Sequence, residues 1–328
     1  MSDEIFNQPW PEEFEPRVEC HHDVTATSLG TVFCKSRPLA QTLYAYPYSM
    51  FKGVALSYAS CMKRWPEQLD MDCMPAFIHS QWSKGYFHWV TESLPRAIIL
   101  RDKFPDACVL LPKYYNTFHS DSLSLLDVNC DYFPSHNLKL SYAAITSCPR
   151  HYGTTDQSLL LRVSEEVRGR VSSKLNYGDK VYISRRKSRG RFVINESQVV
   201  QLLEKYGFVE LVPEDYSFAE QVAIFSKAKF LVSIHGAGLT NMVFMPPGGA
   251  VLELVPFRNG VFDLRPNSFS FKHDDCYLTL SRKMGHEYSF LQCGHDKGKY
   301  SRTNLSNIFV DCEMMGVKVE HLLNLGSK

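Results

Sequence analysis

A short apolar segment, a glycine turn and the start of a helix follow one another in FLVSIHGAGLTN, residues 230–241. The residues up to Ile234 have the composition of a buried strand, and those from Leu239 onward that of a helix. A helix that begins at a glycine turn presents backbone N–H groups without partners, and such groups bind anions. Spacing alone leaves open whether Gly236 and Gly238 admit a phosphorylated ligand or only make the turn.

Further strands and helices alternate on both sides of this turn. Strands are predicted over 181–184, 208–212, 230–234 and 250–255, and helices begin at Asn195, Ser217 and Leu239. This alternation is typical of βαβ units, so we predict a C-terminal domain with a mostly parallel sheet over residues 176–328. The G-x-G pattern lacks the third glycine of a dinucleotide fingerprint and does not follow the first strand of the domain.

The first half of the chain is less regular and rich in aromatic residues. Strands are predicted over 54–58, 108–111 and 138–145, and a helix over 87–101 that Pro95 should end or kink. A further helix over 159–175 connects the halves. We therefore place an N-terminal domain at residues 1–175, although its first 75 residues match no pattern that we can assign.

A basic loop follows the first strand of the predicted parallel sheet. Residues 184–191 read SRRKSRGR, with five basic side chains among eight. Ligands of such sheets bind at the carboxyl ends of the strands, and a guanidinium group can bind two phosphate oxygens at once. Arg185 and Arg191 are therefore candidates for a diphosphate, although a solvated loop or a nucleic-acid contact would show the same composition.

A candidate acid–base pair lies in the first half. His88 and Glu92 are four residues apart within FHWVTESLPR, residues 87–96, so they share one face of a helix. A histidine with an orienting carboxylate can accept a proton, but a histidine that is satisfied locally shows the same spacing. The pair lacks the further ligands of a zinc site.

Two other carboxylate motifs are weaker. Asp70-Met71-Asp72 is a D-x-D triplet of the kind that holds a metal ion and a nucleotide sugar in some transferases, but no apolar strand precedes it and prolines flank it. We predict a surface loop there and no metal site. Glu253 lies near the end of a predicted strand, where a carboxylate can accept ribose hydroxyl groups or simply face solvent.

The composition excludes several classes of protein. The 328 residues hold 36 Lys and Arg against 35 Asp and Glu, and this net charge of +1 gives no global attraction to nucleic acid or anionic lipid. No apolar run is long enough to span a membrane, and the acidic N-terminus is unlike a signal peptide. We predict a cytoplasmic protein without a membrane span, whose ten cysteines are reduced.

Four blocks of the sequence together resemble glycosyltransferase family 61. They are HGAGLTN with the following FMPPGGAVLELVP, YISRR with the later Arg191 and Asn195-Glu196, FHW with Glu92 and LPR, and the stretch from Tyr277 to Tyr288. The family includes plant xylan xylosyl- and arabinosyltransferases, animal O-linked N-acetylglucosaminyltransferases, and bacterial or viral polysaccharide enzymes. The resemblance implies a GT-B-type α/β fold, two Rossmann-like domains facing a central cleft, with a nucleotide-sugar donor and inversion at the anomeric carbon.

The resemblance also implies roles for single residues. A hydroxyl group of a glycan or glycoprotein would accept a sugar such as xylose or N-acetylglucosamine, and His88 or Glu92 would take its proton, with His235 as a rival base. The arginines and the helix start would stabilise the leaving diphosphate without a metal or cofactor. The residues expected to bind a UDP-sugar donor are Arg185, Arg191, His235, Gly236, Ala237, Gly238, Leu239, Thr240, Asn241 and Glu253.

One departure and three alternatives accompany this interpretation. Animal and plant members carry signal anchors that we do not find here, which favours a microbial or viral enzyme. The alternatives are a glycan- or nucleotide-binding relative without catalysis, a dinucleotide-dependent oxidoreductase, and an RNA-binding protein that uses the loop at 185–191.

Overall fold

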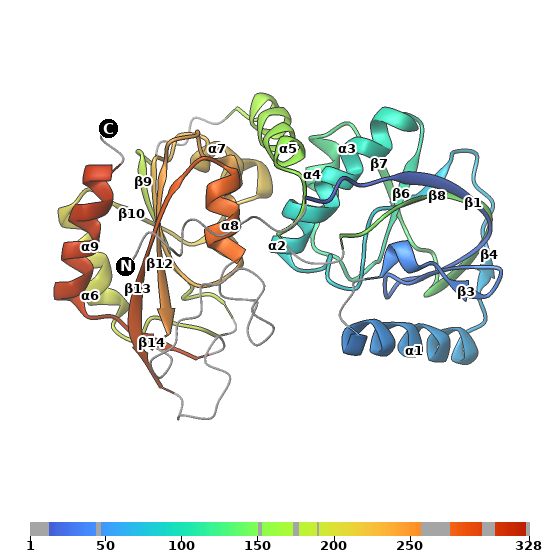
Figure 1. Cartoon of the computed structure of the whole chain (residues 1–328), viewed down its shortest axis with the longest axis horizontal. Coiled ribbons are helices and arrows are strands. Elements are labelled where there is room, and N and C mark those ends of the chain that lie inside the picture. Colours follow the sequence, from blue (N-terminus) through green and yellow to red (C-terminus); the bar gives the residue numbers. More distant parts are fainter. Residues whose placement is uncertain are drawn as a thin grey trace. The chain divides into compact units, whose positions relative to one another are not determined.

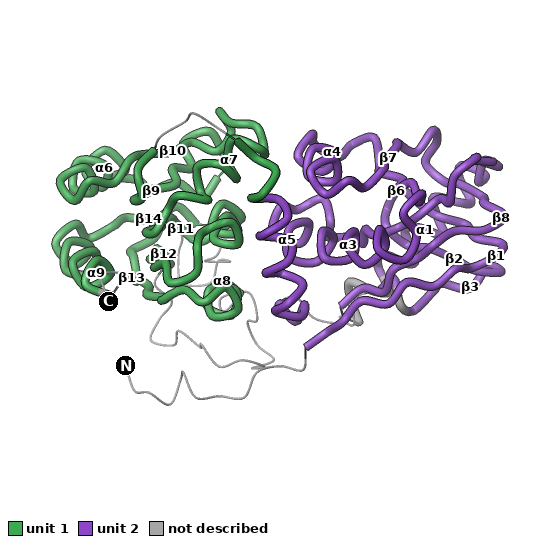
Figure 2. The backbone as a smooth tube through the Cα atoms, turned by 90° about the horizontal axis from the view of Figure 1, so that it is seen from above, with its two compact units in different colours: residues 1–11, 168–328 green, residues 12–167 purple. Residues whose placement is uncertain are grey.

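The structure, a computed structural model, describes residues 13–43, 47–149, 153–172, 177–188, 190–256, 276–296 and 306–325. Two compact units make up the chain, residues 12–167 and residues 168–328 together with 1–11 (Figure 2). Each unit has a sheet of its own with helices beside it (Figure 1). The chain is therefore mixed α/β with two sheets, and the two units separate at 167/168, whereas we predicted a boundary at 175/176.

The sheet of the first unit combines antiparallel and parallel strands. Its order is β3-β2-β1-β8-β5-β6-β7, with β4 on β8. Strands β1 to β3 pair in antiparallel fashion, and β8, β5, β6 and β7 are parallel neighbours. Phe77 of β5 lies beside Ile145 of β8, so the carboxyl ends of these strands are adjacent. The elements are β1 (Val18–Thr27), β2 (Val32–Cys34), β3 (Arg37–Pro38), η2 (Ala40–Thr42), α1 (Pro47–Lys63), β4 (Glu67–Gln68), β5 (Pro75–Phe77), α2 (Tyr86–His88), η3 (Trp89–Ser93), α3 (Leu94–Lys103), β6 (Cys108–Leu111), α4 (Thr117–Ser124), β7 (Asn129–Tyr132), β8 (Asn137–Thr146) and α5 (Gln157–Arg170).

The strand predicted over 54–58 is wrong, because these residues lie in helix α1. Val54 and Tyr58 favour strands, but Ala55, Leu56 and Ala59 beside them are strong helix formers and prevail. The strands predicted over 108–111 and 138–145 are confirmed as β6 and β8.

The helix predicted over 87–101 is confirmed, with an irregularity in its middle. Helix α2 ends at His88, one π-helical turn (η3) spans Trp89–Ser93, and α3 begins at Leu94. Pro95 is the second residue of α3 and lies inside the continuous helix, directly after the π turn, so its missing N–H removes a helical hydrogen bond where the helix is irregular. Turns of the π type are frequent at functional sites.

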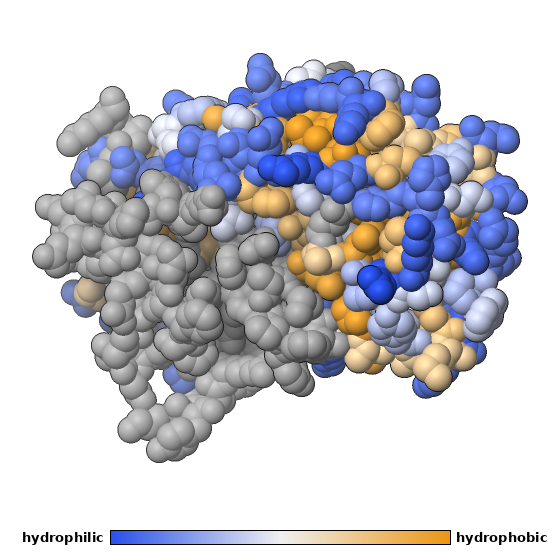
Figure 3. Space-filling view, turned by 45° about the vertical axis from the view of Figure 1, so that its right-hand side comes forward, coloured by the Kyte–Doolittle hydropathy of each residue, from blue (hydrophilic) through white to orange (hydrophobic). Residues whose placement is uncertain are grey.

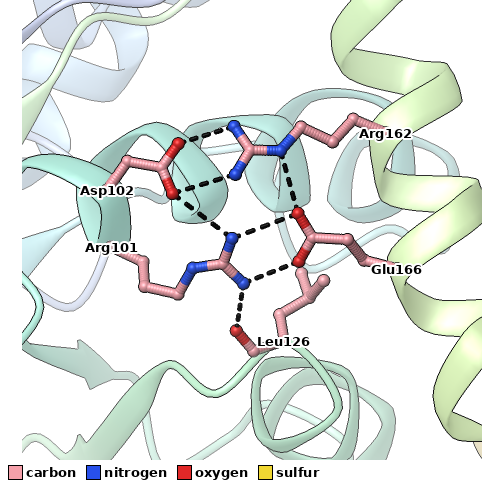
Figure 4. A network of polar contacts seen from close by, with 5 residues as sticks. All are labelled: Arg101, Asp102, Leu126, Arg162 and Glu166. Atoms are coloured by element: carbon pink, nitrogen blue, oxygen red, sulfur yellow. Dashed lines mark hydrogen bonds and ion pairs between the residues drawn. The ribbon is translucent and has the colours of Figure 1, made fainter.

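An ion-pair network fixes α3 to α5 (Figure 4). Nη1 of Arg101 lies 2.7 Å from Oε2 of Glu166 and donates to the carbonyl of Leu126 at 2.6 Å. Arg162 pairs with Asp102 and, at 2.9 Å, with Glu166. The hydrogen bond from Arg101 lowers the pKa of Glu166. Because both carboxylates are shared between the two arginines, the network holds the helices more firmly than isolated surface pairs would.

The second unit has the mostly parallel sheet that the sequence predicts. Its order is β10-β9-β11-β12-β13-β14, and only the last pair is antiparallel. Helices α6 and α9 lie on one face of the sheet, and α7, η5 and α8 on the other (Figure 1). The elements are β9 (Lys180–Ile183), α6 (Glu196–Lys205), β10 (Val209–Leu211), η4 (Pro213–Asp215), α7 (Phe218–Phe225), β11 (Phe230–Ile234), η5 (Ala237–Phe244), β12 (Ala250–Pro256), α8 (Cys276–Lys283), β13 (Glu287–His295), β14 (Ile308–Phe309) and α9 (Cys312–Leu325).

The strand order places a topological switch point between β9 and β11. Strand β10 lies on one side of β9, whereas β11, β12 and β13 follow on its other side. The connections that leave β9 and β11 therefore run in opposite directions at the carboxyl ends of these strands. Ligands of open parallel sheets bind at such switch points.

Two helix starts in this unit were predicted from local signals. The capping box of Ser217 and Glu220 at α7 is confirmed. Asn195 precedes α6 as predicted, but its side chain does not cap the backbone of the helix; it bonds the backbone of Val310 at 2.8 and 3.0 Å and the side chain of Gln198 at 3.2 Å. The start of α6 is thereby tied to the segment before α9.

The surface mixes apolar and hydrophilic residues on the face shown in Figure 3. Across the described ranges, no helix is long and apolar enough to cross a membrane. The ten cysteines are free thiols in the structure. The cytoplasmic location stays a prediction.

Candidate functional site

Two loops of the second unit carry a candidate anion site. Arg185 follows β9, and His235 and Gly236 follow β11, the two strands that flank the switch point. Ser233 of β11 lies beside Ile183 of β9. The residues that leave the two strands therefore emerge next to each other, and the basic loop meets the glycine turn.

The guanidinium groups of Arg185 and Arg191 both lie against Gly236. A Cβ atom at Gly236 would lie 2.3 Å from Nη1 of Arg185 and 3.6 Å from Nη1 of Arg191. Arg191 also donates to the carbonyl of His235 at 3.3 Å, and its φ of +61° is rare outside glycine. Burial and the charge of Arg191 lower the pKa of Arg185 to about 10. The two like charges repel each other, and an anion between them would relieve this repulsion.

Neighbouring basic residues of the loop are neutralised within the protein. Nη1 of Arg186 lies 2.7 and 2.8 Å from the two carboxylate oxygens of Glu210, and Lys187 pairs with Asp215. Arg189 lies outside the described residues. Within the described part of the chain, no carboxylate forms an ion pair with Arg185 or Arg191, so these two side chains keep their charge for a ligand.

The glycine turn differs from the prediction in detail. The helix that follows it is the 3-10 helix η5, in which Leu239, Thr240 and Asn241 are buried. Gly238 serves packing, because a Cβ atom there would lie 3.1 Å from Cγ2 of Ile183. Gly236 instead makes room for the two guanidinium groups. Of the turn residues expected to meet a donor, Ala237 and Gly238 are half-buried.

His235 is held by a buried carboxylate. Its Nδ1 atom hydrogen-bonds to Oε1 of Glu253, and Tyr288 donates its hydroxyl hydrogen to Oε2 of the same residue at 2.6 Å. The side chain of Glu253 is fully buried, whereas that of His235 is 12% exposed. The sequence placed Glu253 at a ribose, but the structure commits both of its oxygens to protein groups. The carboxylate orients the imidazole, and sequence reasoning gave Tyr288 no role.

We expect Gly236→Ala to weaken anion binding. The nearest atoms to the new methyl group are the ends of arginine side chains, which would have to move, and the φ of +159° adds backbone strain that lowers stability. The loss of a charge-assisted contact should reduce the affinity for UDP about tenfold or more, as measured by isothermal titration calorimetry. Gly248→Ala adds the same group at another positive φ, +83°, but in open space, and is the control. Equal affinity in both variants would contradict the placement of the arginines.

The second group of candidate residues lies in the first unit, at the π turn. Nδ1 of His88 lies 3.0 Å from Oε1 of Glu92, so the predicted pair is in contact. Glu92 is buried, and His88 is 22% exposed. Burial raises the pKa of Glu92 well above its usual range, and the nearby Arg96 opposes part of this shift. The pair therefore binds a proton at a higher pH than an ordinary carboxyl group does.

Arg96 completes this group and was missed as a functional residue in the sequence. It is buried, and it donates to Oγ1 of Thr146 at 2.9 Å and to the carbonyl of Thr146 at 3.3 Å. Burial, followed by the charges of Arg96 and His119, lowers the pKa of His79 to about 3. The repeated four-residue spacing from His88 to Glu92 to Arg96 was the available signal for a shared polar face.

The Asp70-Met71-Asp72 triplet lies between β4 and β5, and both aspartates are exposed. Oδ1 of Asp70 accepts a hydrogen bond from Gln68 at 3.2 Å. In the described segments, no group of three or more His, Cys, Asp or Glu side chains is arranged to hold a metal ion. The triplet is part of a surface loop, as the sequence predicts.

Comparison with known proteins finds one family model that covers candidate residues of both units. The sequence profile described as Glycosyltransferase 61 matches residues 86–252, about half of the chain, and this range includes His88, Arg185 and His235. The chain belongs to glycosyltransferase family 61. The resemblance noted in the sequence is thereby confirmed.

The relatives of this family 61 chain include animal and plant enzymes. Protein O-linked-mannose beta-1,4-N-acetylglucosaminyltransferase 2 of Xenopus tropicalis is 32% identical over 108 residues, 32% of this chain and 17% of that protein. The protein of the same name from Bos taurus is 36% identical over 74 residues, 22% of this chain and 13% of that protein. Alpha-1,3-arabinosyltransferase XAT3 of Oryza sativa subsp. japonica is 26% identical over 150 residues, 39% of this chain and 26% of that protein. The chain thus spans about a quarter or less of the length of these relatives.

Proposed function

We propose that this family 61 protein transfers a sugar from a nucleotide-sugar donor to a hydroxyl group of a glycan or glycoprotein. The observation that carries the proposal is the arginine pair at Gly236, which lies at the switch point without a carboxylate partner among the described residues. Two guanidinium groups suit a diphosphate and stabilise the charge that grows as it leaves. The names of the relatives, N-acetylglucosaminyl- and arabinosyltransferases, support the proposal.

In the proposed reaction, the acceptor hydroxyl group attacks the anomeric carbon on the side opposite the diphosphate, which inverts the configuration. His88, with Glu92 as its partner, takes the hydroxyl proton. The bond between the sugar and the diphosphate breaks, and its electron pair leaves with UDP. The two units would form the GT-B arrangement that the resemblance implies, and xylose or N-acetylglucosamine is the kind of sugar expected.

The nucleotide is tested by thermal unfolding in the presence of UDP, GDP or CMP. A ligand that binds the native state raises the melting temperature by an amount set by its concentration and affinity. UDP at millimolar concentration should raise the melting temperature by several degrees in the parent and by less in Gly236→Ala. A shift with GDP but not with UDP would overturn the assignment of the nucleotide.

We expect the reaction to proceed without a metal ion, because Arg185 and Arg191 supply the positive charge that the leaving group needs. Turnover of the donor should survive an excess of EDTA, and Asp70→Asn and Asp72→Asn should be as active as the parent. An absolute requirement for manganese, together with a loss of activity in these two variants, would instead place the triplet at the active site.

A further inference from the structure

We propose that His235 is the acid that donates a proton to the departing diphosphate, and that Glu253 and Tyr288 are the positioning residues that prepare it for this step. The proposal rests on the function proposed above and goes beyond it, because it gives the site a proton donor in addition to its two fixed cations. It also replaces the ribose contact expected of Glu253 by a role that acts through His235.

The sheet register brings the three side chains to one face. Glu253 of β12 lies beside Ser233 of β11, and Val251 lies beside Tyr288 of β13. Side chains two residues apart along a strand point to the same face, so His235, Glu253 and Tyr288 share the face that η5 and α8 cover. The ring of Tyr277 in α8 meets the imidazole edge-on, with 5.3 Å between the ring centroids.

The hydrogen bonds of His235 leave its Nε2 atom as the nitrogen that can meet a ligand. Nδ1 is engaged by Glu253. Within the described part of the chain, no hydrogen bond engages Nε2, and the imidazole is the partly exposed member of the group. A carboxylate on Nδ1 holds the proton of that nitrogen and balances the positive charge of the imidazolium ring, the form in which Nε2 also carries a proton. Burial raises the pKa of Tyr277 well above its usual range, so this neighbour stays neutral.

The position of His235 favours the diphosphate over the acceptor as its target. Its backbone carbonyl accepts a hydrogen bond from Arg191. The guanidinium groups of Arg185 and Arg191 both lie against the next residue, Gly236. Tyr277, whose ring meets the imidazole, also interacts electrostatically with Arg185 and Arg191, so the imidazole and the two cations share this neighbour. A proton donor placed there lies where negative charge develops. In the step proposed, the bond from the anomeric carbon to the β-phosphate oxygen breaks and its electron pair stays on that oxygen. In its imidazolium form, His235 gives the Nε2 proton to a β-phosphate oxygen and becomes neutral, with the remaining ring proton on Nδ1 facing Glu253, while the acceptor proton goes to the separate base.

The test compares two ligands that differ in the negative charge on the β-phosphate. UDP carries a terminal phosphate whose second ionisation lies near pH 6, whereas both phosphates of UDP-N-acetylglucosamine are esterified, so at pH 7.5 UDP has the additional charge. An acid that acts on the leaving group strengthens its contact as that charge appears. His235→Asn and Glu253→Gln should therefore weaken UDP binding about tenfold or more, and UDP-N-acetylglucosamine binding about threefold or less, by isothermal titration calorimetry.

The positioning residues have a matched control in the same unit. Tyr288→Phe removes one hydrogen bond to Glu253 and should weaken UDP binding by about threefold. Tyr182→Phe removes a similar bond, from a buried tyrosine to Glu196 at 2.8 Å, but does not touch His235 and should leave both affinities unchanged. With an active donor, His235→Asn should lower kcat and leave the donor KM within about threefold.

The outcomes separate this proposal from the function on which it rests. An equal loss of affinity for both ligands in His235→Asn would mean that His235 only holds the diphosphate, and would overturn the acid role while leaving the donor site intact. Parent-like binding of UDP by Glu253→Gln would overturn the positioning role. A parent protein that binds neither ligand would overturn the proposed function and this inference with it.

Discussion

Arg185→Ala should lower turnover by about 100- to 1000-fold while the protein stays folded. Removing a charge-assisted contact that strengthens as the diphosphate leaves costs about 2–4 kcal/mol of transition-state stabilisation. Little folding energy is lost with the side chain, whose bond to the carbonyl of Gly190 is long, at 3.4 Å. Turnover of a UDP-sugar and thermal unfolding, measured on the same preparation, check both halves of this prediction.

Three control variants test whether the loss of activity in Arg185→Ala comes from the lost phosphate contact. Arg185→Lys should restore activity only in part, because a lysine is a point charge without the two-pronged geometry. Arg186→Ala removes a charge from the same loop that is already paired with Glu210, so its activity should stay near that of the parent. Leu231→Ala, in the fully buried part of β11, should lose activity by losing about 2–5 kcal/mol of stability. Near-parent turnover in Arg185→Ala would move the phosphate contact to Arg191.

His88→Ala should slow the reaction by about 100- to 10,000-fold, the range of general base catalysis, and leave UDP binding unchanged. His88 is the partly exposed member of its pair, so the base can reach an acceptor without an opening of the fold. Kinetics at saturating donor measure the effect, and His22→Ala, at an exposed histidine of β1, is the control. Full activity in His88→Ala would return the role of base to another residue.

Glu92 gives the same pair a pH dependence. Burial raises its pKa, so the His88–Glu92 pair gains a proton at a higher pH than a solvated carboxyl group does. A pair that already holds this proton cannot accept another from the substrate. Activity should therefore fall as the pH is lowered through the raised pKa, and Glu92→Gln should abolish or displace this acidic limb of the pH profile. An identical limb in the variant would show that another group titrates.

The parallel sheet of the second unit could be predicted because each of its signals is local. Its strands are short buried runs, and the capping box at Ser217 marks the start of α7 within four residues of sequence. The first unit has weaker signals, since β4 and β5 are two and three residues long and gain their partners from β8 far along the chain. Helix α1 was mistaken for a strand because two strand-favouring residues stood out among helix formers.

Part of the candidate site could also be predicted from local sequence, and part could not. Arg185, His235 and Gly236 could be named because each follows a strand whose carboxyl end the sequence already marked. The partners of these residues could not be named, because they depend on which strands lie side by side. The pairing of Glu253 with His235, and of Arg186 with Glu210, can be inferred only from the strand order β10-β9-β11-β12.

The two guanidinium groups at Gly236, which we propose bind the diphosphate, would not distinguish one phosphate compound from another. Inorganic phosphate and pyrophosphate offer the same oxygens as a nucleotide diphosphate, so they compete for Arg185 and Arg191 wherever they are abundant. Added salt screens distant charges more than it weakens such direct contacts. Discrimination in favour of the correct donor must therefore come from residues that read the base, the ribose and the sugar, while the arginine pair fixes only where the ligand is anchored.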